Sequence, residues 1–364
     1  PGPVSLLLLA DSAGSEGGQR GARLPVPSLR LVSQARIQAA AVAIAKTSSP
    51  VIIMNGTALP EAGLKAAARL KGAGIRVLTD TFYAKMRRGA GVFAPERLQY
   101  FAEGAMGDLE GTDLMILAGT SAPVAFFSYP GKPSLLVPEG CERLDLGDAS
   151  TDSAATLTAL ADAMNANTSA PFETLTEPDL PTGDLTAQTV GQSLARHMPE
   201  DALVSDDGVS NGLLSYLPTQ NAQPHDWMML TGGAIGQGMP LALGAAIAAP
   251  DRKVICLSGD GAGMYTNQAL WSMAREGADV TTIVFVNHSY RILNIELYRT
   301  GAGNPGPTAK SMLSIGGPDI DWVQLSSSMG VPAVEATSAE GFDKALADAI
   351  AAPGPRLIAA VVPG

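Results

Sequence analysis

An acidic and an amide side chain follow two apolar runs of this sequence, each at the point where the run ends. A Gly-Asp-Gly turn centred on Asp260 follows the run 254–257, and Asn287 follows the run 280–286. A helical pattern at 264–276 separates the two runs, so the order predicts a βαβ unit. Because parallel strands end at the same edge of a sheet, where ligands of open α/β sheets bind, we expect Asp260 and Asn287 to face one point.

The side chains at this point predict a metal site made only of oxygen atoms. The Asp260 carboxylate, the Asn287 amide oxygen and a free carbonyl such as that of Ser289 are the hard ligands that Mg²⁺ prefers, with phosphate and water completing the shell. Gly261 and Gly263 would let backbone N–H groups approach a phosphate. The alternative is a plain turn with Asn287 as a strand-end cap. The amide 27 residues beyond Asp260 favours the metal site.

The same spacing resembles the signature of the thiamine-diphosphate-dependent enzymes, the family of acetolactate synthase, benzoylformate decarboxylase and pyruvate decarboxylase. The usual signature ends in Asn-Asn; the first of the pair is Val286 here, and the metal-binding second is Asn287. The resemblance implies thiamine diphosphate and Mg²⁺ as cofactors. It also implies that Asp260, Asn287 and the Ser289 carbonyl hold the metal.

A glycine-rich turn at 231–240 extends this resemblance. In the family, the positions of Gly233 and Ile235 hold the aminopyrimidine, and the Ile235 side chain would bend the cofactor so that its own amino nitrogen reaches C2. An ordinary core role for Ile235 is the alternative. The cofactor-binding residues implied are Gly208, Ser210, Asn211, Gly233, Ile235, Gly259, Asp260, Gly261, Ala262, Asn287, Ser289 and Tyr290.

The implied reaction is attack of the cofactor's C2 ylid on a 2-oxo acid and loss of CO₂, followed by protonation or transfer to an acceptor. No catalytic residue is expected on this chain, only support from Ile235 and Leu293. Leu293 stands where pyruvate decarboxylases carry Glu, as in benzoylformate decarboxylase, and an acetolactate-synthase-like ligase stays open. The family's activating Glu belongs to a first domain absent here, so we expect this chain alone to be inactive and a full-length homodimer or homotetramer to be active.

Length and composition predict the domain organisation. With 364 residues, 46% of them apolar, the chain can bury two cores. The alternation of apolar runs and helical patterns predicts an α/β fold with two doubly wound parallel-sheet domains, the first of them Rossmann-like. The resemblance implies that the second binds diphosphate and Mg²⁺ and that 1–30 is the tail of a missing pyrimidine-binding domain plus a linker. The other expected parts are 31–164 as the central domain, 165–184 as a second linker, and 185–364 as the C-terminal domain.

Apolar runs and their periodicity predict the elements of both domains. Strands are expected at 3–10, 51–54, 75–78, 114–118, 135–137, 202–205, 254–257, 280–286, 331–334 and 356–362. Helices are expected at 37–46, 60–71, 96–103, 186–197, 264–276, 291–298, 322–329 and 340–351. A loose loop at 301–307 could cover the site.

Charge and cysteine content exclude several classes of function. The net charge of −11 without a Lys/Arg cluster argues against a nucleic-acid partner. No apolar run is long enough to span a membrane. Cys141 and Cys256 lie far apart, and a buried thiol at Cys256 suits the reducing cytoplasm.

Two other functions were weighed. A non-catalytic cofactor-binding or assembly protein is one alternative. A nicotinamide oxidoreductase is disfavoured, because the Gly-x-Gly-x-x-Gly fingerprint is absent after 51–54 and incomplete at 236–241. FAD, which some relatives hold in the central domain, has no positive sign in this sequence. None of the three histidines is assigned a role.

Overall fold

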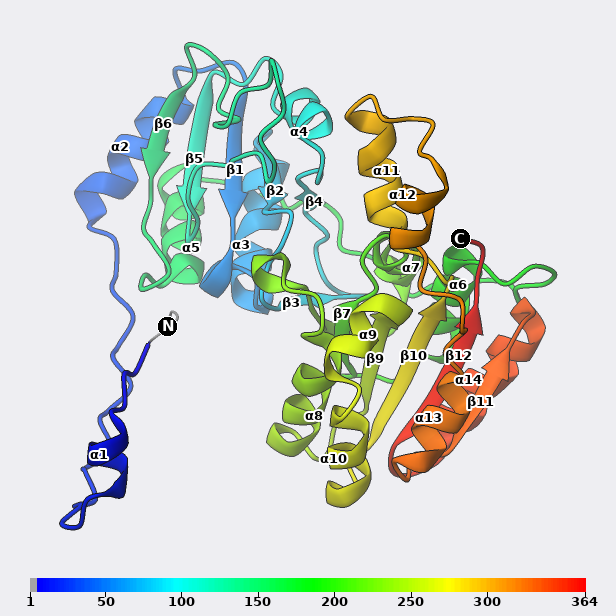
Figure 1. Ribbon diagram of the computed structural model, residues 1–364. Coiled ribbons are helices and arrows are strands. Elements are labelled where there is room, and N and C mark those ends of the chain that lie inside the picture. The colour runs from blue at the N-terminus through cyan, green and yellow to red at the C-terminus, as the bar shows by residue number, and fades with distance from the viewer. Residues whose placement is uncertain (1–4) are drawn as a thin grey trace.

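Two parallel sheets organise the computed structural model, which describes residues 5–364 (Figure 1). The central domain has a five-stranded sheet in the order β4-β2-β1-β5-β6, and the C-terminal domain has a seven-stranded sheet in the order β11-β12-β10-β9-β7-β8-β3. Both are covered by helices. The expected α/β fold class is therefore confirmed.

The central sheet is buried on both faces. Every residue of β5 is buried, as are all but the first of β1, without the alternation of a half-exposed strand. Helices α2, α3 and α5 pack together against it. The elements are α2 (Gln34–Ile44), β1 (Pro50–Met54), α3 (Glu61–Gly72), β2 (Arg76–Thr79), β4 (Glu96–Arg97), α4 (Ala102–Asp108), β5 (Leu114–Ala118), β6 (Glu142–Asp145) and α5 (Ser153–Ala163).

Three expected elements of the N-terminal half are wrong. Of the strand expected at 3–10, residues 3–4 lie outside the described part, and 5–9 are exposed and pair with no strand before α1 (Ala10–Gly14). A strand needs a neighbour to satisfy its backbone, and this one has none. The helix expected at 96–103 is β4 followed by α4, and 135–137 forms only one bridge, Val124↔Leu135.

The C-terminal sheet is built around β10, all of whose residues are buried. The expected helix 264–276 is two helices, and the expected loop 301–307 runs into α12. The elements are α6 (Ala187–His197), β7 (Leu203–Asp207), α7 (Gly212–Tyr216), β8 (His225–Met228), α8 (Gly238–Ala248), β9 (Val254–Gly259), α9 (Asp260–Thr266), α10 (Ala269–Glu276), β10 (Val280–Val286), α11 (Arg291–Arg299), α12 (Pro307–Met312), α13 (Trp322–Ser328), β11 (Ala333–Ala336), α14 (Ala339–Ala351) and β12 (Arg356–Val361).

A strand from the central part of the chain joins the C-terminal sheet. Strand β3 (Met86–Arg88) lies within the range expected for the central domain, yet it pairs antiparallel with β8. Arg88 is buried, its guanidinium carbon lies 3.3 Å from the centroid of the Tyr216 ring, and its Nη1 donates to the Tyr216 carbonyl at 3.2 Å. The two sheets are therefore tied together at this edge.

The helices of the described chain give no sign of membrane insertion. Among residues 5–364, no helix combines the length and the apolarity needed to cross a bilayer.

We predict that Arg88→Ala destabilises the fold by about 2–4 kcal/mol, because a buried cation–π contact and the hydrogen bonds to Tyr216 are lost together. Urea unfolding followed by circular dichroism measures this. Lys85→Ala, at an exposed position just before β3, is the control and should change the unfolding free energy by less than about 0.5 kcal/mol. If the two variants were equally stable, Arg88 would not stabilise the contact between the two sheets.

Candidate functional site

The tips of β9 and β10 meet through the carboxylate of Asp260. The two strands are parallel neighbours, with Gly259 opposite Phe285. Asp260 Oδ2 accepts the backbone N–H of Asn287 at 3.0 Å and that of His288 at 2.7 Å. The structure thus places Asp260, a predicted metal ligand, in contact with the end of β10.

Asp260 is held rigidly in a buried position. Its side chain is 3% exposed, and Oδ1 accepts the N–H of Gly261 at 2.8 Å. Burial raises the pKa of Asp260, and hydrogen bonds from the N–H groups of His288, Gly261 and Asn287 act against this rise. Oδ1 has room for a further ligand beside this one bond, since an ionised carboxylate offers about four acceptor sites and three of them are filled here.

The Asn287 amide and the Ser289 carbonyl lie on one side of the chain. Asn287 Oδ1 accepts the N–H of Ser289 at 3.1 Å. Ser289 forms an antiparallel bridge with Ser314. The residues on either side of the two serines make the hydrogen bonds of this bridge, so the N–H and C=O of Ser289 itself point away from Ser314. Within residues 5–364, no group donates a hydrogen bond to that carbonyl. These three oxygen donors suit a hard cation such as Mg²⁺.

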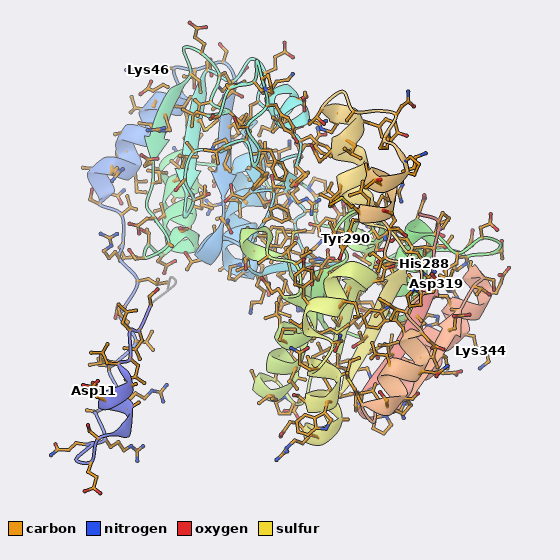
Figure 2. The ribbon with its side chains drawn as sticks, in the orientation of Figure 1. Asp11, Lys46, His288, Tyr290, Asp319 and Lys344 are labelled. Carbon is orange, nitrogen blue, oxygen red and sulfur yellow. The ribbon has the colours of Figure 1, made fainter. Side chains whose placement is uncertain are left out.

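Residues 5–364 offer no competing cluster of soft or acidic ligands. Among the described residues, no three His, Cys, Asp or Glu side chains gather in a way that could hold a metal. His288 is half-buried, and its Nδ1 lies 3.6 Å from Asp319. Figure 2 shows His288, Tyr290 and Asp319 close together at the upper edge of the C-terminal domain.

Packing requires the two glycines that follow Asp260. A Cβ added to Gly261 would lie 2.6 Å from Tyr290 Cε1, and one added to Gly263 would lie 2.7 Å from the Trp322 ring. Close approach of these two rings therefore requires glycine. Gly259 has open space, and Ala262 is buried against the strand tip.

The end of β7 carries three further residues implied by the resemblance. β7 is the other neighbour of β9, so Gly208 follows a strand tip beside that of Asp260. Ser210 lines a large cavity, whereas Asn211 is buried. The Asn211 side chain makes no capping hydrogen bond to α7.

The glycine-rich turn adopts a backbone that only glycine accepts readily. Gly232, Gly233 and Gly236 have φ values of 67°, 65° and 92°. The turn leads from the end of β8 into α8, and Gly233 and Ile235 line the same cavity as Ser210. The turn thus presents Ile235 to the cavity instead of burying it in a core.

This cavity, of about 980 Å³, lies between the two domains. Its C-terminal-domain wall includes Leu293 on α11. Its central-domain wall is aromatic: the ring of Phe126 lies 5.3 Å from those of Phe82 and Tyr100. Both domains therefore build the site, which sequence motifs in the C-terminal domain could not show.

Helix α11 closes one side of the cavity by reaching the central domain (Figure 1). Glu296 accepts a hydrogen bond from the Tyr129 hydroxyl, and Arg299 pairs with Glu103 at 2.7 Å. Glu296 is thus engaged in holding the two domains together. Tyr290 N–H donates to the Leu313 carbonyl, which fixes the start of this segment.

The other two histidines lie away from the strand tips. His225, which the sequence placed in a polar loop, is buried in β8, and burial lowers its pKa to about 3. His197 Nε2 lies 3.1 Å from Asp343.

Comparison with known proteins decides the family. Residues 208–360 match the family described as thiamine pyrophosphate enzyme, C-terminal TPP binding domain. A Mycobacterium tuberculosis protein named as an acetolactate synthase large subunit is 46% identical over 364 residues, covering 99% of this chain and 70% of that protein. The chain belongs to the thiamine-diphosphate-dependent enzymes. The predicted resemblance is confirmed, and thiamine pyrophosphate is the same cofactor under another name.

Other members of this family share the architecture. Benzoylformate decarboxylase of Pseudomonas aeruginosa is 30% identical over 266 residues, covering 69% of this chain but only 48% of that enzyme. The solved structure of a 4-hydroxybenzoylformate decarboxylase from Rhodococcus jostii aligns with a TM-score of 0.75 at 22% identity, covering 97% of this chain and 67% of that one. Benzoylformate decarboxylase from Polynucleobacter necessarius aligns at 0.74 and 21%, over 97% and 69%. These two structures support the fold alone.

The structure of this family member also reveals site residues that sequence reasoning missed. Asp206 and Asp207 end β7 fully buried, and Arg97 lines the cavity. Two adjacent acids at the end of an apolar strand were the available signal. Arg97 gave no such signal, because residues 96–103 were expected to form a helix.

A second cavity, of about 740 Å³, lies at the ends of β5 and β6 in the central domain and is lined by Arg36 and Arg143.

We predict that Gly261→Ala destabilises the protein by about 1–3 kcal/mol, because the new Cβ overlaps the Tyr290 ring. Chemical denaturation measures the change. Gly259→Ala is a matched control two residues away, since its Cβ would meet only Ala262 at 4.0 Å. If both variants unfolded alike, the packing of Tyr290 on Gly261 would be refuted.

Proposed function

We propose that this protein uses thiamine diphosphate together with Mg²⁺ to act on a 2-oxo acid, by decarboxylation with protonation or carboligation. The observation that carries the proposal is Asp260, whose buried carboxylate joins the tips of β9 and β10. Asn287 Oδ1 and the Ser289 carbonyl would complete the protein's share of a Mg²⁺ shell. The donor set fits the ion without a change of side chain.

The chain's own residues would bind and orient the cofactor. When bound, thiamine diphosphate supplies a thiazolium that serves as the electron sink for decarboxylation. Gly208 and Ser210 would contact the diphosphate at the tip of β7, and Gly233 and Ile235 would hold the aminopyrimidine. The apolar side chain of Leu293, on the cavity wall, would keep water away from the reacting carbon.

The lining of the large cavity favours a 2-oxo acid with a bulky apolar or aromatic substituent. The Phe82, Tyr100 and Phe126 rings offer edge and face contacts to an aromatic group. Arg97 pairs with no carboxylate among residues 5–364, and its Nη1 reaches only Met229 Sδ at 3.4 Å. An anion of the substrate would satisfy it. Benzoylformate, named for two of the relatives, has this chemistry. Acetolactate synthesis is the second candidate, through the Mycobacterium tuberculosis relative that is 46% identical.

We also propose a homodimer or homotetramer. Helix α8 is apolar around its whole circumference, yet Ile247 is 60% exposed, and Trp271 on the adjacent α10 is 53% exposed. A helix apolar on every face is normally covered. Sedimentation velocity tests this, and a monomer at micromolar concentration would refute it.

We predict that Asp260→Ala weakens Mg²⁺-dependent binding of thiamine diphosphate by about 100-fold or more, because a metal ligand and the bridge between the strand tips are lost. Isothermal titration calorimetry with and without EDTA measures the affinity. Asp319→Ala, an exposed acid beside His288, is the control and should bind as the wild type does. Unchanged affinity in Asp260→Ala would remove the metal site from the proposal.

We predict that Arg97→Gln raises the KM for benzoylformate about 10- to 100-fold, because a charge-assisted contact to the carboxylate is lost. Steady-state CO₂ release by the full-length protein, with benzoylformate and with pyruvate, measures it. Arg36→Gln, in the second cavity, should leave the KM unchanged. Pyruvate preferred over benzoylformate by the wild type would favour the acetolactate-synthase-like reaction, and cofactor binding without turnover would favour a non-catalytic role.

A further inference from the structure

The side chain of Asp207, the last residue of β7, accepts hydrogen bonds from the backbone of the glycine-rich turn. Its side chain is 1% exposed, and Oδ2 accepts two backbone N–H groups of the turn, Gly236 at 2.8 Å and Gly238 at 3.1 Å. One oxygen thus holds the N–H groups of the two residues on either side of Gln237. Hydrogen bonds to an ionised acceptor are about twice as strong as neutral ones.

The fixed peptide groups determine where Ile235 points. The Gly236 N–H belongs to the peptide plane that also carries the Ile235 carbonyl, so holding that N–H sets the orientation of Ile235. The other side of Gly236 is held as well, since Thr266 Oγ1 donates to its carbonyl at 2.7 Å. A Cβ on Gly236 would lie 2.7 Å from Tyr265 Cβ, so the turn has no room to shift toward α9.

The second oxygen of this carboxylate explains why an amide cannot replace it. Asp207 Oδ1 is buried and has no hydrogen-bond partner among residues 5–364. An asparagine in its place would accept from the two N–H groups through a neutral amide oxygen, and its NH₂ would be a buried donor at the position of Oδ1, where no acceptor lies. An acceptor-only group therefore fits this position better than its isosteric amide.

The surroundings of Asp207 are poor in compensating charge. Burial raises the pKa of Asp207 to about 6, the N–H groups of Gly238 and Gly236 oppose the rise, and Asp206 adds to it. The Cys256 thiol on β9 is the other titratable group facing it, and its pKa is raised well above the ordinary value by burial and by the two acids. The turn and the start of α8 contribute no charged group.

We propose that Asp207 is a positioning residue, whose carboxylate fixes the backbone of Gly236 and Gly238 so that Ile235 projects into the cavity against the bound cofactor. The consequence for the cofactor rests on the function proposed above. The hydrogen bonds from Gly236 and Gly238 to Asp207, called the clamp below, are present in the chain without cofactor. The two parts can therefore be tested separately.

Hydrogen exchange of the cofactor-free protein tests the clamp. In Asp207→Ala and Asp207→Asn, amide protection within 231–240 should fall about 10- to 100-fold at pH 7.5, because bonds to a charged acceptor are lost. Asp206→Asn is the matched control: this neighbouring buried acid accepts from Gly208 and Trp227, not from the turn. Wild-type protection of 231–240 in both Asp207 variants would overturn the proposal.

The pH dependence separates a clamp from a general effect on the fold. Protection of 231–240, corrected for the intrinsic exchange rate, should fall in the wild type as the pH drops through about 6, the pKa of Asp207, and stay flat in Asp207→Asn. A carboxyl whose pKa is higher in the folded than in the unfolded state makes the fold more stable on protonation, so global unfolding through this group would give the opposite trend. A flat wild-type profile would contradict the clamp.

Cofactor titration tests the consequence. Asp207→Asn should bind thiamine diphosphate with Mg²⁺ about tenfold more weakly than the wild type. Equal affinity together with lost protection would overturn the positioning role. A wild type that binds no thiamine diphosphate would refute the proposed function, while the exchange experiment would still decide the clamp.

Discussion

The contact between the Asp260 carboxylate and the N–H groups at the end of β10 is the constraint on which the site depends. Parallel strands end with N–H groups that no further ladder bond satisfies, and a buried carboxylate needs donors. The carboxylate accepts these N–H groups, so the donors and the acceptor are both satisfied. The contact fixes where the chain that carries Asn287 and Ser289 leaves the sheet.

A similar arrangement recurs at the neighbouring strand tip. Asp207 ends β7 as Asp260 follows β9, and each is buried and accepts backbone N–H groups from a segment distant in sequence. In one case the segment carries the oxygen donors, and in the other it carries Ile235. Acids at adjacent strand ends thus turn loops, which are ordinarily the most mobile parts of a fold, into rigid walls of the site.

The cavity shows that the C-terminal domain alone does not make the site. The aromatic wall and Arg97 come from the central domain, and α11 reaches back to it through Glu296 and Arg299. Strand β3 ties the two sheets at another edge. These contacts join the two domains on both sides of the cavity and so define its shape.

The spacing of Asp260 and Asn287 carried the resemblance that implied the family, while apolar runs and helix periodicity predicted the two sheets. The meeting of Asp260 with the β10 tip followed because neighbouring parallel strands end at the same edge of a sheet. The range 96–103 was misread as a helix, and nothing in the sequence indicated that β3 joins the distant sheet or that Asp207 holds the glycine-rich turn. Strand pairing at an edge, the packing of Tyr290 on Gly261 and the place of Arg97 on the cavity wall depend on which distant segments become neighbours. Only the tertiary structure settles that, because such contacts arise between residues whose separation along the chain carries no information about their separation in space.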